Sequence, residues 1–130
     1  MVLNVGTNVG VEVNDAVLNY NGLVGIVTKV EKNKCNVKLL TSNFNISVRI
    51  NDTYGNLNDS VVTMIDKYSD INIGDDIYTS GLDDVPGDIY VGEVLSVSLD
   101  NDELGKEVKV KLVDNNYLNY VYIVGNIEWF

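Results

Sequence analysis

The side chains in this sequence that could act as nucleophiles are the single cysteine, Cys35, and the serine of the segment Thr79-Ser80-Gly81. A nucleophilic serine or cysteine needs a neighbouring base, which is most often histidine, and the 130 residues contain no histidine. A lysine could take its place, but the lysine nearest to Ser80 along the chain, Lys67, has no motif around it. We therefore interpret Thr79-Ser80-Gly81 as a fold signature and Cys35 as a filler of the core or of a sheet edge.

Carboxylates offer two other kinds of chemistry, glycoside hydrolysis and metal binding. Aspartate and glutamate number 19, so closeness in sequence means nothing for hydrolysis unless a cleft holds two of them. The loop DNDELG at residues 100–105 has oxygen ligands at the first and third positions of a calcium-like loop, but Leu104 stands at the fifth and no glutamate closes it. Zinc would lack both histidine and a second thiol. We expect no metal, no cofactor and no enzymatic activity.

The charge and composition limit the classes of partner and the cellular locations that fit this sequence. The net charge is −10 and Arg49 is the one arginine, so the molecule repels phosphate backbones and we expect no binding to nucleic acid. No apolar run is long enough to span a bilayer, and the first residues lack the features of a signal peptide. If the protein works outside a membrane, we expect its export and anchor segment to be missing from this chain.

The elements that must position these residues follow an internal repeat. The segment VEVNDAVLN at residues 11–19 matches INIGDDIYT at residues 71–79, an offset of 60. The offset becomes 67 between LVGIVTKV at 23–30 and YVGEVLSV at 90–97, and 73 between VKLL at 37–40 and VKLV at 110–113. One supersecondary unit has thus been used twice, with longer loops in the second copy.

The secondary structure is predicted to be almost entirely strand. Valine, isoleucine, threonine and tyrosine alternate with polar residues, and asparagine, aspartate and glycine interrupt them about every ten residues. Closure into a barrel suits units this small, because it removes sheet edges. We predict an all-β fold of two small antiparallel β-barrels, each with about five to six strands, over residues 1–66 and 67–130. An alternative is that the N-terminal strand completes the second barrel.

Glycines occupy equivalent places in the two copies. Gly25 and Gly92 lie within matching strands, where a missing side chain permits a sharp bend or a close approach of backbone. Gly74 and Gly81 flank the most distinctive predicted strand. We expect substitution of Gly92 by valine to damage folding.

The order of these motifs resembles the extracytoplasmic part of the MreC family of cell-shape-determining proteins over nearly the whole chain. NGLVGIVTKV, VKLLT, SVRI, INIGDDIYTSGL, YVGEVLSV and KEVKVKLV carry the resemblance. The most specific piece resembles the family pattern GDxVxTSG, then a Pro-containing loop, then IG. Here the matching residues are Gly74, Asp75, Thr79, Ser80, Gly81, Pro86 and Gly92. The chain departs from the pattern at Asp88, where the family has a glycine two residues after the proline, so the turn is expected to be shifted.

The resemblance implies a non-catalytic scaffold of the cell-elongation and peptidoglycan-synthesis machinery, held on the outer side of the bacterial membrane by an N-terminal anchor. It implies binding to the elongation transpeptidase, a class B penicillin-binding protein, association with MreD, and self-association. A carbohydrate- or wall-binding barrel is the alternative, and it would show a cleft with exposed aromatic faces. A hydrolase comes third.

Aromatic residues are the best indication of where a partner binds, because they dominate interface energetics. They gather at the C-terminal end, and one further tyrosine lies between the two units. The candidate contact residues are Tyr54, Tyr117, Tyr120, Trp129 and Phe130. An alternative interpretation places the C-terminal group in the core and in barrel closure.

Overall fold

The chain folds into short antiparallel strands, as its alternating apolar pattern predicts. The computed structural model describes residues 1–42, 45–101, 103–113 and 121–125. They form eleven strands and one turn of 3-10 helix, η1 (Thr7–Val9). The strands are β1 (Val2–Leu3), β2 (Ala16–Asn19), β3 (Gly22–Val30), β4 (Cys35–Leu39), β5 (Ile46–Ile50), β6 (Thr53–Asn58), β7 (Val61–Asp66), β8 (Asp76–Thr79), β9 (Tyr90–Leu99), β10 (Gly105–Leu112) and β11 (Tyr122–Val124).

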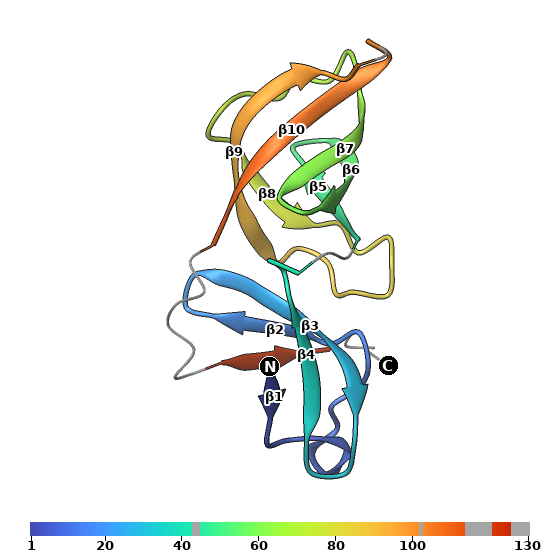
Figure 1. Ribbon diagram of the computed structural model, residues 1–130, viewed down its shortest axis with the longest axis vertical. Coiled ribbons are helices and arrows are strands. Elements are labelled where there is room, and N and C mark those ends of the chain that lie inside the picture. The colour runs from blue at the N-terminus through green and yellow to red at the C-terminus, as the bar shows by residue number, and fades with distance from the viewer. Residues whose placement is uncertain (43–44, 102, 114–120, 126–130) are drawn as a thin grey trace.

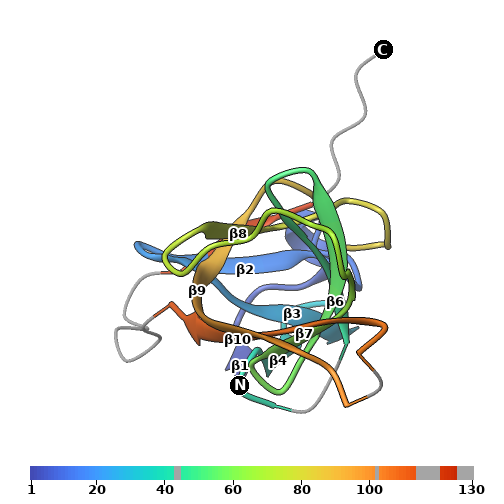
Figure 2. The ribbon, with the colours of Figure 1, turned by 90° about the horizontal axis from the view of Figure 1, so that it is seen from above.

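The strands form two sheets stacked along the long axis of the molecule (Figures 1 and 2). One is a closed barrel of six strands in the order β10-β7-β6-β5-β8-β9. The other is a curled sheet of five strands, β1-β4-β3-β2-β11, which we call the half-barrel. The predicted all-β class with five to six strands in each unit is confirmed, although the half-barrel is not closed.

The grouping of strands differs from the division predicted at residue 66. Strands β5, β6 and β7 precede that point, yet they belong to the closed barrel with β8, β9 and β10. The first strand, β1, pairs with β4 of the half-barrel, and β11 returns from the other end of the chain to pair with β2. The sequence repeat covers only three strands of each unit, so it carries no information about where the flanking strands pair.

The three sequence offsets reappear in the register of the strands. In the half-barrel, Val17 of β2 faces Gly25 of β3, and Gly25 faces Leu39 of β4. In the closed barrel, Ile77 faces Gly92 and Gly92 faces Leu112. These three residues lie 60, 67 and 73 positions after their counterparts. The register shifts immediately after Val17 and again after Ile77, so even the irregularity is repeated.

The core is continuous across the two sheets. Strand β3 is buried on both faces, which explains its unbroken apolar run. One face of the half-barrel contributes Ala16, Leu23, Ile26 and Leu40 to the cluster that fills the closed barrel. The other face forms a smaller cluster around Val11, Val17, Val27, Cys35 and Val37.

Candidate functional site

The predicted signature lies in β8 and in the loop that follows it, residues 80–89. Thr79 is completely buried. Its hydroxyl donates to the carbonyl oxygen of Pro86 at 2.7 Å and accepts from the backbone N–H of Ile89 at 3.0 Å. One side chain therefore ties both the proline and the end of the loop to the barrel.

The half-barrel has the same hydrogen bond at the equivalent place. The Asn19 side-chain oxygen accepts from the N–H of Gly22 at 3.2 Å, and these residues lie 60 and 67 positions before Thr79 and Ile89. Asn19 spans a tight turn whereas Thr79 spans a ten-residue loop. A contact found in both copies is needed to connect two strands, so it gives Thr79 a structural role.

Ser80 and Gly81 shape the start of this loop. The Ser80 hydroxyl donates to the Ser47 hydroxyl at 2.7 Å and accepts from the N–H of Leu82 at 3.0 Å. Gly81 has φ of +77°, and a Cβ atom added to Gly87 would lie only 3.0 Å from the Gly81 Cα. Gly87 is therefore the residue that permits the close approach to Gly81. Asp88, at the position where the family has glycine, has a left-handed φ of +63°. No base contacts Ser80 among the described residues, so the geometry supports folding rather than nucleophilic chemistry.

The turn before β8 also has a counterpart. Asp75 accepts from the N–H of Asn72 at 2.8 Å, as Asp15 accepts from the N–H of Glu12 at 2.9 Å. Gly74, which precedes Asp75, has φ of +90°, and the equivalent Asn14 has φ of +75°. Asparagine and glycine are the residues that tolerate this left-handed backbone best.

Gly25 and Gly92 are required by close backbone approach. A Cβ atom at Gly25 would lie 2.5 Å from the carbonyl oxygen of Lys38, and one at Gly92 would lie 2.2 Å from that of Lys111. Real Cβ atoms do not approach carbonyl oxygens so closely. The two glycines therefore let a neighbouring strand cross at equivalent points.

An Arg-Tyr row crosses the outer face of the closed barrel, and it contains the predicted contact residue Tyr54. Tyr54 of β6 faces Arg49 of β5, Arg49 faces Tyr78 of β8, and Tyr78 faces Tyr90 of β9. The Arg49 guanidinium lies 5.2 Å from the centre of the Tyr78 ring, and the Tyr78 and Tyr90 ring centres are 5.7 Å apart in an edge-to-face arrangement. We call these four residues the Arg-Tyr row. Tyrosine and arginine are enriched in protein interfaces, so the row could contact a protein partner.

The Arg-Tyr row also contacts the loop that follows β8. Arg49 forms an ion pair with Asp88 at 3.3 Å.

Burial raises the pKa of Tyr90, and the carboxylates of Asp76 and Glu93 raise it further. Tyr54 was predicted as a contact residue because it lies between the two sequence units, whereas Arg49, Tyr78 and Tyr90 were not predicted. The alternation of residues in the predicted strands SVRI and DIYT could have placed Arg49 and Tyr78 on outer faces.

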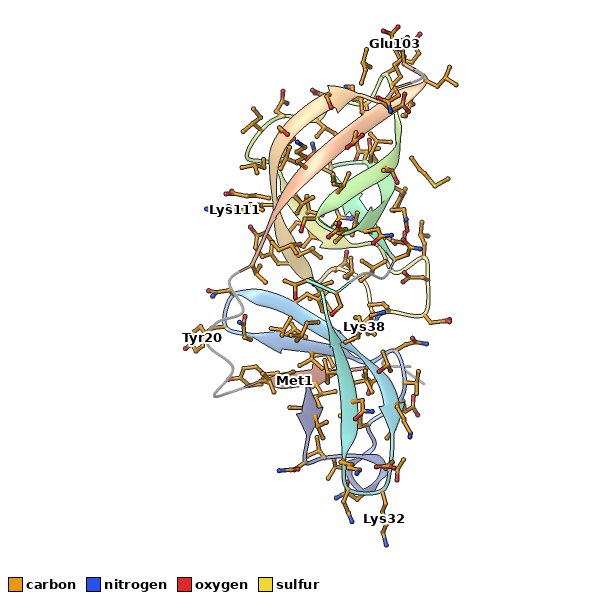
Figure 3. The ribbon with its side chains drawn as sticks, viewed as in Figure 1. Met1, Tyr20, Lys32, Lys38, Glu103 and Lys111 are labelled. Carbon is orange, nitrogen blue, oxygen red and sulfur yellow. The ribbon has the colours of Figure 1, made fainter. Side chains whose placement is uncertain are left out.

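The other predicted aromatic contacts, Tyr117, Tyr120, Trp129 and Phe130, lie outside the described residues. Among the described tyrosines, Tyr20 is the most exposed, with 94% of its surface accessible at the turn between β2 and β3 (Figure 3). Tyr20 lies in the half-barrel, outside the Arg-Tyr row. Exposed aromatic surface is therefore present on both units.

Two hollows lie on the described surface. The larger, of about 580 Å³, is on the half-barrel. It is lined by Val5, Val9, Gly10, Val11, Glu12, Asp15, Val121, Tyr122, Ile123 and Gly125. The smaller, of about 260 Å³, lies beside Tyr90 and includes Glu93 and Lys111. Asp15, one of the two carboxylates in the larger hollow, closes a turn as Asp75 does and therefore has a structural role there.

The remaining candidates for chemistry also have structural surroundings. Cys35 is buried in the half-barrel, and burial raises the pKa of its thiol, which makes it a poor nucleophile. The Asp100 carboxylate accepts from the N–H of Leu104 at 3.1 Å and so closes the loop considered for calcium. Within the described ranges, no group of three or more His, Cys, Asp or Glu side chains is placed to hold a metal ion. None of the helical segments described there could cross a membrane.

Comparisons with known proteins agree with the fold. The family model "Rod shape-determining protein MreC, barrel core" matches residues 1–125. The cell shape-determining protein MreC of Streptococcus pneumoniae is 34% identical over 97% of this chain. The chain spans only 52% of that relative, about half its length.

Two solved structures extend the comparison. The major periplasmic domain of the cell shape-determining filament MreC superposes with a TM-score of 0.85, at 33% identity over 97% of this chain and 85% of that domain. MreC from a complex with penicillin-binding protein 2 (PBP2) of Helicobacter pylori superposes with a TM-score of 0.72, at 30% identity over 90% of this chain and 82% of the other. The resemblance found in the sequence motifs is confirmed.

Proposed function

Because the chain belongs to the MreC family of rod shape-determining proteins, we propose that it is the extracytoplasmic scaffold region through which such a protein binds the elongation transpeptidase. The scaffold organises peptidoglycan synthesis by position and performs no catalysis itself. The transpeptidase would be a class B penicillin-binding protein.

The observation that carries this proposal is the H. pylori complex, in which an MreC with the same fold assembles with a penicillin-binding protein. This chain aligns with 82% of that MreC, so the barrels form most of the compared molecule. The surfaces described above suit a contact role, since they expose aromatic and apolar side chains. The reactive groups, Ser80 and Cys35, are engaged or buried.

Three finer features belong to the same proposal. The protein would be held at the outer side of the bacterial membrane by a segment that this chain does not include, would associate with MreD, and would self-associate. All three come from the family resemblance.

At the Arg-Tyr row, the carbohydrate-binding alternative is less well supported. A sugar stacks on the open face of an aromatic ring, but the Arg49 guanidinium already covers one face of Tyr78. The Arg-Tyr row is therefore better suited to a protein partner. Soluble wall fragments serve as the comparison ligand in the test.

The test is a titration of this chain with the extracytoplasmic part of the elongation transpeptidase from the same organism, at low and at high salt. Micromolar or tighter binding supports the proposal, and weaker binding at high salt would show that the charge of −10 steers association. Binding of wall fragments without binding of the transpeptidase would instead favour the alternative. A folded chain that binds neither would contradict the proposal.

A further inference from the structure

The half-barrel lacks a counterpart of one strand that the closed barrel has. Strand β11 lies beside β2 as β5 lies beside β8, because Tyr122 faces Leu18 and Arg49 faces Tyr78, 60 residues after Leu18. Strand β1 lies beside β4 as β7 lies beside β10, with Leu3 facing Cys35 and Val62 facing Val108. Between β5 and β7 the closed barrel has β6, and the described part of the half-barrel has no equivalent. Among the described residues, strands β1 and β11 are therefore the edges of this sheet.

The larger hollow lies on this open side. Its lining comes from β11 and its neighbours on one side and from the segment that follows β1 on the other. Five of its ten lining residues are valine or isoleucine, namely Val5, Val9, Val11, Val121 and Ile123. Val9 is 64% exposed and Tyr122 is 59% exposed. Exposed side chains such as Val9 and Tyr122 beside an unpaired strand edge form a surface that proteins normally cover.

The closed barrel shows what kind of element fits this place. There β6 is an extended strand, antiparallel to β5 on one side and to β7 on the other. Along an antiparallel strand, the backbone groups of successive residues point alternately to one neighbouring strand and to the other. The N–H of Ser80 bonds to the carbonyl oxygen of Ser47, so the backbone groups of Ser47 face β8. Ile50 lies three residues further along β5, so its backbone groups face β6. Ile123 is the counterpart of Ile50 in β11. An incoming strand would therefore find backbone donors and acceptors along β11 and apolar side chains beneath it.

Charge indicates which partner provides the strand. The hollow contains the carboxylates of Glu12 and Asp15, and none of the described residues that line it is a lysine or an arginine. A second copy of this chain could offer its own edge strands, but it would bring a net charge of −10 to a hollow that already contains carboxylates. A segment with lysine or arginine beside alternating apolar residues would match both the charge and the apolar lining.

We propose that the half-barrel is completed by an extended, Lys- or Arg-bearing segment of the transpeptidase, which adds as a strand to β11 and covers the hollow. The assignment rests on the proposed function, and it locates the contact on the half-barrel rather than on the Arg-Tyr row.

Hydrogen exchange of the chain, measured alone and with a saturating amount of the extracytoplasmic part of the transpeptidase, tests the location. We expect the amide of Ile123, which as the counterpart of Ile50 faces away from β2, to exchange rapidly in the free chain and slowly in the complex. The amides of residues 6–12 are already hydrogen-bonded in the free chain and should change little. The central strand β3 provides the internal reference, because it is paired on both sides in either state.

Paired substitutions test the side chains. Val9→Glu places a charge in the hollow and should weaken binding at least about tenfold, whereas Val13→Glu, at a valine that is 51% exposed and outside the hollow, should leave it within about twofold. Glu12→Gln should weaken binding several-fold and reduce its dependence on salt, while Glu31→Gln, which lies outside the hollow, should not. Circular dichroism of each variant verifies that it is folded.

Each other outcome would overturn the proposal in a distinguishable way. Binding that protects only the closed barrel leaves the proposed function intact but moves the site to the Arg-Tyr row. Protection of the Ile123 amide in the free monomer, equal to that of β3, means that the chain itself covers this edge. Protection that grows with chain concentration alone identifies a second copy as the occupant. Absence of any binding overturns the proposed function as well.

Discussion

In the closed barrel, β8, β9 and β10 continue on both sides into β5, β6 and β7, whereas in the described part of the half-barrel β2, β3 and β4 are flanked by the short strands β1 and β11 alone. The three shared strands nevertheless agree in register, in their bulge and in the hydrogen bonds of their turns. The comparison separates fold from function. Features present in both copies are needed to build the unit, and features present in one copy are the candidates for recognition.

Several residues of the family signature have counterparts in the half-barrel, and we therefore assign them a structural role. Asp75, Thr79 and Gly92 have counterparts in Asp15, Asn19 and Gly25 that make equivalent contacts. The Arg-Tyr row and the open hollow have no such counterparts. These two regions are where substitutions should affect binding more than folding.

The largest effect is expected from valine at the two strand glycines. In Gly92→Val, the new side chain meets the Lys111 carbonyl oxygen at 2.2 Å, and we expect a loss of more than about 3 kcal/mol in the free energy of unfolding. Gly25→Val should cost less, because the open edge of the half-barrel lets its strands move apart. Urea unfolding followed by circular dichroism measures both. Unchanged stability of Gly92→Val would remove the argument from close approach.

A smaller effect is expected at Thr79. Thr79→Val leaves the Pro86 carbonyl and the Ile89 N–H without their partner in a buried site, which should cost about 2 to 4 kcal/mol. Thr79→Ser keeps the hydroxyl and should recover most of that loss. Asn19→Ala should cost less than Thr79→Val, because its tight turn is partly exposed. If Thr79→Ser were as unstable as Thr79→Val, the hydroxyl would not be the important group.

The Arg-Tyr row should contribute little to stability. Arg49→Gln removes an ion pair with Asp88, whose side chain is 85% exposed, and the contact with Tyr78, so we expect a loss of at most about 1 kcal/mol. Part of this loss should disappear as salt is added, and Arg49→Lys should retain the charge-dependent part. A loss well above this range would indicate that the row supports the barrel itself.

The smallest effect is expected at Cys35, because the closed barrel has Val108 at the equivalent position. Cys35→Val should change stability by less than about 1 kcal/mol at pH 7. Burial raises the pKa of the native thiol, so the folded state keeps its proton more tightly than the unfolded state. The stability of the natural chain should therefore fall, relative to Cys35→Val, as the pH rises above the unfolded thiol value of about 8.5. Parallel unfolding curves at pH 7 and pH 10 measure this difference.

The sequence predicted the all-β class and the shared strands because a repeat and an alternating pattern are local properties. The equivalence of Gly25 and Gly92 followed from spacing alone. The division between the units did not, since β5 pairs with β8 across 30 residues and β11 returns to β2 from the far end of the chain. Pairings of that kind depend on which edges remain free after the local units have formed.

The candidate site was harder to predict than the fold. Tyr54 was predicted from its position between the two sequence units, but its neighbours in the row come from three other strands and meet only through register. The open edge could not be found from the sequence either, because it consists of a strand that one copy has and the other lacks.

The apolar cluster shared by the two sheets makes the molecule a single mechanical body. Ala16, Leu23, Ile26 and Leu40 of the half-barrel are packed into the same interior as the closed barrel, so the units cannot bend against each other without exposing that interior. A force applied to one unit would therefore be transmitted to the other through this shared core. A partner gripped at the half-barrel would thereby be held at a fixed angle to whatever contacts the closed barrel.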